Sequence, residues 1–321
     1  MSSKNIVITG SAGFIGSHLS ELLLNNGGFV IGIDNFHDYY DPKLKQANTD
    51  RLKTFPNYTG YNADIRDKDA INKIFAENQP VDIIIHLAAI PGVKMSIQSP
   101  AEYFDVNVNG TVTVLEACRT HGVKRVIFGS SSSVYGNNQN VTFSETDRAD
   151  YPISPYAASK RAAELICYTY NHIYDINIAI VRFFTVYGPR QRPDLAIHKF
   201  TRLVDENGII PVFNNGKCCR DYTYIDDITQ GLKRIMENDF VGYDIINLGE
   251  SDTTSTLDII RLIESALGKT AKIEKLPPQP GDVDHTHANI SHAQAAYGYM
   301  PEVHIEEGIK RFVDWYKGSK N

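Results

Sequence analysis

Short apolar runs alternate with amphipathic segments through the first half of the chain. Residues 5–9 and 29–33 are almost continuously apolar, which is typical of strands buried in a parallel sheet. Between them, apolar positions recur at helical spacing up to about Leu24. The pattern predicts a strand, a helix and a second strand, arranged as a βαβ unit with a right-handed crossover.

The same alternation continues to about residue 184. Because strands separated by helices pair in parallel, we expect an α/β fold with a Rossmann-type doubly wound parallel sheet. Ligands of such sheets bind beyond the carboxyl ends of the strands. Further strands are predicted at 58–63, 81–87, 125–129 and 176–184, and further helices at 67–77, 100–121 and 156–174.

The composition of the chain changes after about residue 188, where proline and aromatic residues become frequent. We interpret this part as a smaller, discontinuous α/β C-terminal substrate domain. It is predicted to comprise about 188–223 and 250–321. Residues 1–187 and about 224–249 are predicted to form the first domain, which carries the parallel sheet.

The composition of the 321 residues narrows the class of protein. Apolar residues make up 42% and charged residues 22% of the chain, as in soluble globular proteins. The net charge of −6 argues against binding to nucleic acid or to an anionic membrane. No apolar run is long enough to span a bilayer. The chain opens on a few polar residues and the first strand, so we expect no signal peptide and a cytoplasmic location.

The cysteines and histidines predict neither disulfides nor a metal site. Cys118, Cys167, Cys218 and Cys219 have neither disulfide-framework nor metal-knuckle spacing, and we interpret them as reduced thiols. The histidines are scattered without metal-ligand spacing. We therefore expect no metal.

A glycine-rich segment, Gly10-Ser-Ala-Gly13-Phe-Ile-Gly16, joins the first strand to the first helix. Such glycines permit a tight turn and bring backbone N–H groups close to a pyrophosphate at a helix N-terminus. Asp34 ends the second strand, where it can accept a hydrogen bond from the 2′-hydroxyl of an adenosine ribose. A 2′-phosphate would be repelled there, and no arginine follows directly. The segment therefore favours NAD over NADP.

Tyr156 and Lys160 lie one turn apart at the start of a predicted helix. A phenol with a pKa of about 10 is a poor base at neutral pH, but a neighbouring ammonium group favours the phenolate. Such pairs also occur on ordinary solvated helices, so the surroundings must decide. The other candidate residues favour a catalytic role for the pair, because they follow the carboxyl ends of the predicted strands and so lie at one edge of the sheet. They are Gly10, Asp34, Asp64, Leu87, Ser131 and Thr185.

These residues belong to a series of motifs that resembles the extended short-chain dehydrogenase/reductase family, the NAD-dependent sugar-nucleotide epimerases and dehydratases. The resemblance covers essentially the whole chain. The motifs are Thr9-Gly-x-x-Gly-Phe-Ile-Gly16, Asp34-Asn35, Asp64, His86-Leu-Ala-Ala89, Asn107-Val-Asn-Gly-Thr111, Ser130–Gly136, Tyr156-x-x-x-Lys160, Arg182-Phe-Phe-x-Val-Tyr-Gly-Pro189, Arg220-Asp-Tyr-x-Tyr-Ile-Asp-Asp227 and Gly281-Asp-Val283.

The resemblance implies roles for the two domains and their residues. The first domain would hold NAD tightly and regenerate it in each cycle, and the second would bind a sugar nucleotide. Tyr156 and Lys160 would be catalytic with help from Ser131, and Arg220 would contact the nucleotide diphosphate. A homodimer through the helices near 100–121 and 156–174 is also implied. The expected cofactor-binding residues are Gly10, Gly13, Phe14, Ile15, Gly16, Asp34, Asn35, Asp64, Ile65, Leu87, Ala88, Ala89, Asn107, Tyr156, Lys160, Phe183 and Val186.

The residues at 132 and 133 distinguish among the reactions of this family. In the similar 4,6-dehydratases an Asp-Glu pair precedes Val-Tyr-Gly, and UDP-glucuronate decarboxylases have Glu at the second position. Here both are serines, Ser132 and Ser133. Hydroxyl groups cannot replace a carboxylate that must take up a carbon-bound proton. Dehydration is therefore disfavoured, decarboxylation loses a family feature, and C4 epimerisation is favoured.

The segment Arg190-Gln-Arg-Pro-Asp-Leu-Ala196 bears on the substrate. It is similar to the Arg-Pro-Asp-Met-Ala signature of the UDP-glucuronate 4-epimerases within this family, with Leu in place of Met. Arg192 offers a planar fork that matches a C6 carboxylate. A surface arginine in a Pro-rich loop is the other interpretation. The expected substrate-binding residues are Ser131, Ser132, Ser133, Thr185, Arg192, Arg220 and Asp282.

Two other functions stay open. The same chemistry could act on a neutral UDP-hexose such as UDP-glucose or UDP-N-acetylglucosamine. Many relatives that epimerise neutral sugars have Arg where this chain has Gln279, which leaves one uracil or phosphate contact undefined. A non-catalytic NAD(H)-sensing scaffold is the second alternative, and the complete set of Ser131, Tyr156 and Lys160 argues against it.

Three polar residues near the motifs have simpler interpretations than chemistry. We expect His86 to pack at the end of its strand. Asp226 and Asp227 lie at a predicted helix start, where N-capping explains them better than metal binding.

Overall fold

A computed structural model of the chain describes residues 4–138, 140, 142–216, 218–277 and 285–319. The chain divides into two compact units. The first comprises Met1–Asn137, Arg148–Arg182 and Thr229–Ile246, and the second comprises Asn138–Asp147, Phe183–Ile228 and Asn247–Asn321. Residues 138–147 and 183–187 therefore group with the second unit, whereas the sequence pattern places them in the first domain.

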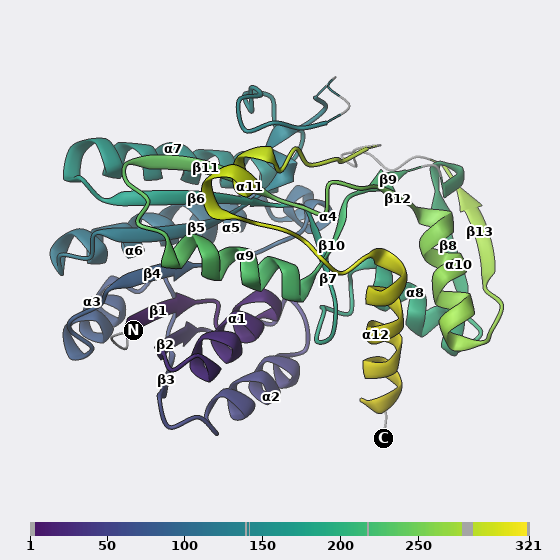
Figure 1. Cartoon of the computed structure of the whole chain (residues 1–321), viewed down its shortest axis with the longest axis horizontal. Helices are drawn as coiled ribbons and strands as arrows, with labels where there is room; N and C mark the ends of the chain where they lie inside the picture. The colour runs from purple at the N-terminus through teal and green to yellow at the C-terminus, as the bar shows by residue number, and fades with distance from the viewer. Residues whose placement is uncertain (1–3, 139, 141, 217, 278–284, 320–321) are drawn as a thin grey trace. The chain divides into compact units, whose positions relative to one another are not determined.

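The first unit contains a seven-stranded sheet with the strand order β11-β6-β5-β4-β1-β2-β3 (Figure 1). The pairs β1–β2, β1–β4, β2–β3 and β4–β5 are parallel. The predicted α/β fold with a Rossmann-type parallel sheet is confirmed. The strands are β1 (Asn5–Thr9), β2 (Phe29–Asp34), β3 (Tyr58–Asn62), β4 (Ile83–His86), β5 (Arg125–Ser131), β6 (Asn177–Phe183) and β11 (Tyr243–Leu248).

The central strands are apolar on both faces because both faces of the sheet are covered. On one face, Val7 and Ile84 belong to a core cluster that includes Ile71, Leu115 and Cys167 from three helices. On the other face, α1 packs on β1 and β2, and α1 and α9 lie on the viewer's side of the sheet in Figure 1. The helices of this unit are α1 (Phe14–Asn25), α2 (Pro42–Leu52), α3 (Lys68–Glu77), α4 (Val93–Gln98), α5 (Pro100–Phe104), α6 (Gly110–Thr120), α7 (Pro155–Tyr174) and most of α9 (Ile225–Glu237), with a 3₁₀ turn η2 (Ser132–Tyr135) after β5.

The segment predicted as a helix over 100–121 is helical over 100–120, but it is not a regular α-helix throughout. A π-helical segment, η1 (Asp105–Asn109), separates α5 from α6. Within it, the buried Asn107 side chain contacts the backbone of Ile90 and the side chain of Ser159. π turns insert an extra residue into a helix and often occur at functional sites. The side chain of Asn107 therefore links η1 to the segment after β4 and to α7.

The second unit has short strands and a helical layer. Strands β8 and β13 pair in parallel, as do β7 and β10, whereas β9 and β12 are antiparallel. Helix α10 packs against α8 and α12. The elements of the second unit are β7 (Thr185–Tyr187), α8 (Ala196–Asp205), β8 (Ile209–Phe213), η3 (Asn214–Gly216), β9 (Cys219–Arg220), β10 (Tyr222–Tyr224), β12 (Thr254–Ser255), α10 (Thr256–Leu267), β13 (Lys272–Leu276), α11 (Ser291–Tyr297) and α12 (Ile305–Gly318).

Asp226 and Asp227 lie inside the first turn of α9 and not at its cap. The carboxylate of Asp227 accepts hydrogen bonds from the backbone N–H groups of Glu302 and Val303, at 3.0 and 3.1 Å. The predicted N-capping role is therefore wrong for Asp227, which anchors a distant loop. Over the described ranges, no helix combines the length and apolarity needed to cross a membrane.

Candidate active site

The glycine-rich turn after β1 needs glycine at two positions for different reasons. Gly10 has φ of +73°, and a Cβ there would lie 2.9 Å from the backbone nitrogen of Ala88. A Cβ on Gly16 would overlap the carbonyl oxygen of Gly10. Gly10 therefore packs directly against the backbone after β4, and Gly16 packs against Gly10. A larger side chain at either position would force these backbone segments apart.

The N-terminus of α1 has no capping group from its own sequence. Gly13 is the N-cap residue and makes no side-chain cap, and the first turn contains no acidic residue. Because the first N–H groups of an α-helix lack partners within the helix, they can bind an anion here. This arrangement, which includes the backbone of the predicted residues Phe14 and Ile15, fits the pyrophosphate of a dinucleotide.

Asp34, at the end of β2, is a buried carboxylate with backbone donors. It accepts hydrogen bonds from the N–H groups of Ala12, at 3.1 Å, and Phe36, at 2.9 Å. Burial raises its pKa, while these bonds and the charge of Lys45 oppose that shift. Lys45 is itself buried and donates to the carbonyl of His37 at 2.8 Å. Asp34 therefore ties the glycine-rich turn to the loop after β2.

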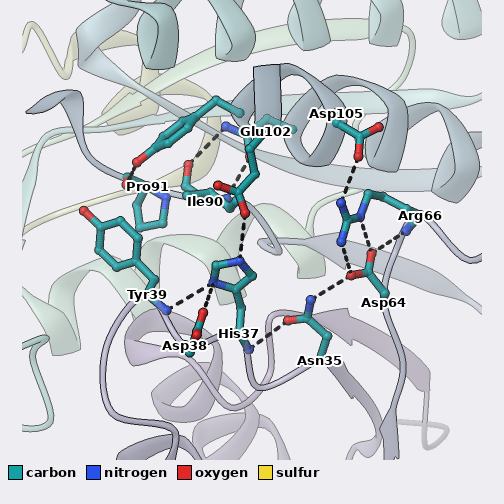
Figure 2. Close-up of polar contacts among 12 residues, drawn as sticks. Asn35, His37, Asp38, Tyr39, Asp64, Arg66, Ile90, Pro91, Glu102 and Asp105 are labelled. Carbon is teal, nitrogen blue, oxygen red and sulfur yellow. Dashed lines mark hydrogen bonds and ion pairs between the residues drawn. The ribbon is translucent and has the colours of Figure 1, made fainter. Parts of the chain in front are cut away.

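Asp64 lies after β3 in a network of charged side chains (Figure 2). The guanidinium group of Arg66 donates two hydrogen bonds to the Asp64 carboxylate, at 2.9 and 2.8 Å, and one to Asp105 at 2.8 Å. Asn35 donates to Asp64 at 2.9 Å. The bonds from Arg66 hold the pKa of Asp64 at about 2. Sequence reasoning found Asp64 and Asn35 but missed Arg66, although an arginine two residues from a candidate carboxylate is a usable signal.

A second set of contacts in Figure 2 joins the loop after β2 to α5. The ring of His37 lies 3.3 Å from a carboxylate oxygen of Glu102 and accepts from the backbone N–H of Tyr39 at 3.1 Å. The loops after β2 and β3 are therefore each linked to the α5–η1 segment.

Two predicted cofactor residues, Asn107 and Ile65, are occupied by protein contacts. Asn107 exchanges hydrogen bonds of 2.8 and 3.1 Å with the backbone of Ile90 and donates to Ser159 at 3.0 Å. Ile65 is buried in the core cluster. Asn107 thereby links the segment after Leu87, Ala88 and Ala89 to α7.

His86 packs at the end of β4 as predicted. Its ring nitrogens lie 2.6 Å from the hydroxyl of Thr9 and 3.1 Å from that of Thr111. Burial, with the nearby charge of Lys160, lowers its pKa to about 3. The ring is therefore neutral at physiological pH and unsuited to act as a base.

The start of α7 orients Tyr156. Ser154 caps the helix by accepting from the N–H of Ala157 at 3.1 Å, and Pro155 follows in the first turn. The ring of Tyr156 meets that of Tyr103 edge to face, with centroids 6.2 Å apart. The cap and this contact fix the direction of the Tyr156 side chain.

Lys160 is buried one turn further along α7. Its Nζ donates to the carbonyl of Gly129 at 2.8 Å and lies 5.1 Å from the centroid of the Phe128 ring. Burial lowers its pKa to about 8. The ammonium group is thereby brought to the end of β5, two residues before Ser131.

Ser131, the last residue of β5, and the two serines that follow it form a compact turn. Ser131 accepts from the N–H of Ser133 at 3.2 Å, and the two hydroxyl groups lie 3.2 Å apart. Ser132 follows Ser131 and begins η2. The structure therefore brings the end of β5 and Lys160 together.

Three predicted substrate residues, Thr185, Arg192 and Arg220, belong to the second unit. The backbone of Thr185 donates to Asp221 at 3.0 Å. Arg192 makes a bidentate pair with Asp194, at 2.9 and 2.8 Å. Arg220 donates to the carbonyl of Cys219 at 3.1 Å. Asp282 lies outside the described residues. Two predicted cofactor residues, Phe183 and Val186, are buried in this unit.

Sequence reasoning gave no role to Asp221, which follows Arg220 directly. Its fully buried carboxylate accepts from the backbone N–H groups of Glu250, Ser251 and Ala288, at 2.7, 3.1 and 3.0 Å. It therefore fixes the loop that carries Arg220 to two other segments of the second unit. In the described part of the chain, no group of three or more His, Cys, Asp or Glu side chains could hold a metal ion.

Known proteins resemble this chain over its full length. A family model described as GDP-mannose 4,6 dehydratase matches residues 7–312. A UDP-glucuronate 4-epimerase from Thermodesulfobacterium geofontis is 43% identical over 97% of this chain and 95% of its own.

Two solved structures also match. The UDP-glucuronic acid 4-epimerase of Bacillus cereus, in complex with UDP-glucuronic acid and NAD, is 37% identical with a TM-score of 0.92, over 98% of this chain and 99% of that one. The UDP-glucose 4-epimerase of Thermotoga maritima, with UDP-glucose, is 30% identical with a TM-score of 0.91, over 99% and 100%. From the family match and the full-length relatives together, the chain belongs to the GDP-mannose 4,6 dehydratase family of the extended short-chain dehydrogenases/reductases.

Proposed function

We propose that this protein is an NAD-dependent isomerase that converts UDP-glucuronate to UDP-galacturonate by epimerisation at C4. The observation that carries the proposal is the contact of α7 with the end of β5, where Lys160 donates to Gly129 at 2.8 Å beside the serine turn. Full-length similarity to UDP-glucuronate 4-epimerases supports it. The family model is named for a dehydratase, but Ser132 and Ser133 lack the carboxylates that dehydration needs.

The residues of the first unit fit NAD. The uncapped start of α1 would bind the pyrophosphate, and Asp34 and Asp64 would contact the adenosine. Gly10 and Gly16 leave the space that a Cβ would fill. Bound NAD would accept the C4 hydride and return it to the opposite face of the sugar.

The chain's own groups would handle the proton. Tyr156, as the phenolate favoured by the charge of Lys160, would take the proton of the C4 hydroxyl group and later give it back. Ser131 would donate a hydrogen bond to the same oxygen. Between these steps the 4-keto sugar must turn over, which requires a loosely held sugar and a firmly held UDP. Arg220, whose neighbour Asp221 is fixed by three backbone donors, would bind the diphosphate. Asp282, which lies outside the described residues, would also contact the substrate.

The carboxylate of the substrate creates a second requirement. A 4-keto sugar with a C6 carboxylate is a β-keto acid, which readily loses CO₂. Arg192, Ser132 and Thr185 would hold the carboxylate near the ring plane, with Ser133 adjacent, so that the breaking bond does not overlap the carbonyl group. The half-exposed partner of Arg192, Asp194, is a carboxylate that the substrate carboxylate could replace.

The direct experiment is incubation with UDP-glucuronate without added NAD, followed by chromatographic separation of the products. UDP-galacturonate supports the proposal. A UDP-pentose indicates decarboxylation and contradicts it, as does the absence of turnover in protein that carries bound NAD.

A second candidate is 4-epimerisation of a neutral UDP-hexose. The similarity to the UDP-glucose 4-epimerase structure favours it. Turnover of UDP-glucose or UDP-N-acetylglucosamine at rates above that of UDP-glucuronate would select this alternative.

We also propose a cytoplasmic homodimer that pairs through α5, α6 and α7. Large apolar side chains on these helices support the interface, since Phe104, Leu165, Tyr168 and Ile173 are 39, 52, 52 and 62% exposed. Four free thiols are consistent with a reducing compartment. Sedimentation at micromolar concentration tests the dimer, which a monomer would contradict.

A further inference from the structure

Glu164 is a fully buried carboxylate on α7, one turn beyond Lys160 and two turns beyond Tyr156. Its oxygens accept from Arg182 at 2.9 and 2.8 Å, from Arg161 at 3.0 Å and from the hydroxyl of Ser130 at 2.6 Å. A buried charge requires this kind of pairing. The carboxylate is therefore held in one place by four donors.

The Glu164–Arg182 ion pair contacts one residue before Ser131 and one residue after it. Before it, Ser130 donates to Glu164, and Gly129 accepts from Lys160 at 2.8 Å. After it, the guanidinium of Arg182 lies 4.7 Å from the centroid of the Tyr135 ring, at the end of η2. The segment 129–135 is therefore anchored to α7 directly and through Arg182.

We propose that the Glu164–Arg182 pair positions Ser131 relative to Tyr156 and Lys160. It acts through Ser130 and Tyr135, because neither charged side chain contacts Ser131 in the described contacts. Bidentate arginine–carboxylate pairs fix orientation as well as distance. The inference rests on the proposed epimerase function, since Ser131 matters in it as the group that hydrogen-bonds the C4 oxygen.

Ser130→Ala is the most selective test because it removes the link to β5 and leaves the ion pair intact. Displacement of a catalytic group by about 1 Å can cost up to 100-fold in rate. We expect kcat for UDP-glucuronate to fall about 10- to 100-fold, with KM within about 2-fold of the wild-type value. A merely structural role predicts the opposite pattern, with lower thermal stability and unchanged kcat per folded molecule.

Glu164→Gln and Glu164→Asp extend the test. Gln keeps the shape and loses the charge, so we expect a larger loss of kcat than for Ser130→Ala. Asp keeps the charge, and partial recovery of kcat relative to Gln is expected. The matched control is Glu116→Gln on α6, since Glu116 accepts from Arg119 and Tyr170 but has no described bond to β5. Its kcat should stay unchanged.

Amide hydrogen exchange of the holoenzyme supplies a readout that does not depend on turnover. Exchange across residues 129–135 should accelerate in Ser130→Ala and Glu164→Gln and stay unchanged in Glu116→Gln. Wild-type kcat in folded Ser130→Ala, or unaltered exchange in that segment, overturns the inference. Failure of the wild-type protein to epimerise UDP-glucuronate would instead remove the proposed function, and the exchange data would still decide whether the pair positions this segment.

Discussion

Two arginine–carboxylate pairs in this chain share one bidentate geometry and differ in their surroundings. Arg182 and Glu164 have side chains 1 and 0% exposed, whereas those of Arg192 and Asp194 are 14 and 42% exposed. The N–O distances are 2.8 Å in both. Water can replace a partner in the second pair but not in the first. The same contact is therefore fixed in one unit, which suits a positioning role, and exchangeable in the other, which suits a substrate-binding role.

The largest expected effect comes from breaking the buried pair. Arg182→Met would leave Glu164 charged and buried with a weaker set of partners. Removal of one partner of a buried pair costs about 3–5 kcal/mol, and urea denaturation should show a loss of this size. Arg161→Met is the control, because Arg161 binds the same carboxylate but is 23% exposed and should cost about 1 kcal/mol or less. Equal losses for the two variants would contradict the distinction between buried and accessible partners.

Removing the exchangeable arginine should affect the reaction and not the fold. Arg192→Ala is expected to raise the free energy of the transition state for UDP-glucuronate by about 1.5–3 kcal/mol, the value of a hydrogen bond to a charged group. The value of kcat/KM should then fall roughly 10- to 140-fold. The share of decarboxylated product should rise. Arg202→Ala is the control. Arg202 lies 3.6 Å from the carboxylate of Glu206, both side chains are exposed, and the substitution should change neither kcat/KM nor the product ratio. An Arg192→Ala enzyme with unchanged turnover and product ratio would refute the assignment.

Lys160 is a third cation with a different environment. It is buried like Arg182, but it donates to a carbonyl group and not to a carboxylate. Burial lowers its pKa to about 8, so the charged form that favours the Tyr156 phenolate predominates only below about pH 8. Activity should therefore fall about tenfold for each pH unit above about 8. Lys160→Arg keeps its charge at higher pH, so this alkaline limb should move upward even if the rate is lower. A wild-type profile that is flat to pH 10 would exclude Lys160 as the titrating group.

The smallest expected effect is on the exposed acid. Asp194→Asn weakens the internal partner of Arg192 and should lower KM for UDP-glucuronate a few-fold, with less than about 1 kcal/mol change in stability. UDP-glucose, which has no carboxylate, should show no such change. A higher KM for UDP-glucuronate would mean that Asp194 orients Arg192 for the substrate and does not compete with it.

The parts of the fold that follow local periodicity could be predicted from the sequence. The bounds of β1 match the predicted strand, and those of β2 differ only by inclusion of Asp34. The glycine-rich turn and the one-turn spacing of Tyr156 and Lys160 on α7 also depend on residues close in sequence. These features were predictable because the residues that determine them are neighbours in the sequence.

Helix α2 was missed because its buried face is mostly polar. Its buried residues are Lys45, Asn48, Thr49 and Leu52, so no apolar stripe marks the helix. Asp41 caps it and Pro42 begins it, a helix-start signal that could have found it.

The paired charges could not be predicted because their partners are chosen by tertiary structure. Glu164 and Arg182 lie on different elements, and nothing in either local sequence identifies the other. The pairing of Arg192 with Asp194 is close in sequence, but a bidentate contact across a proline depends on the path of the loop. The motifs therefore predict candidate reactive groups and leave out the residues whose side chains contact their surroundings.

The π-helical segment η1 sets the rotational phase between α5 and α6. Each residue of an α-helix turns the chain by about 100°, so without the π turn the extra residue would rotate everything after it by that amount. Tyr103, before the turn, contacts Tyr156, and Thr111, after it, contacts His86. A regular α-helix with the same number of residues would bring one of these two contacts out of alignment with the sheet. The spacing of side chains along this edge thus depends on the count of residues in one helix as much as on their identity.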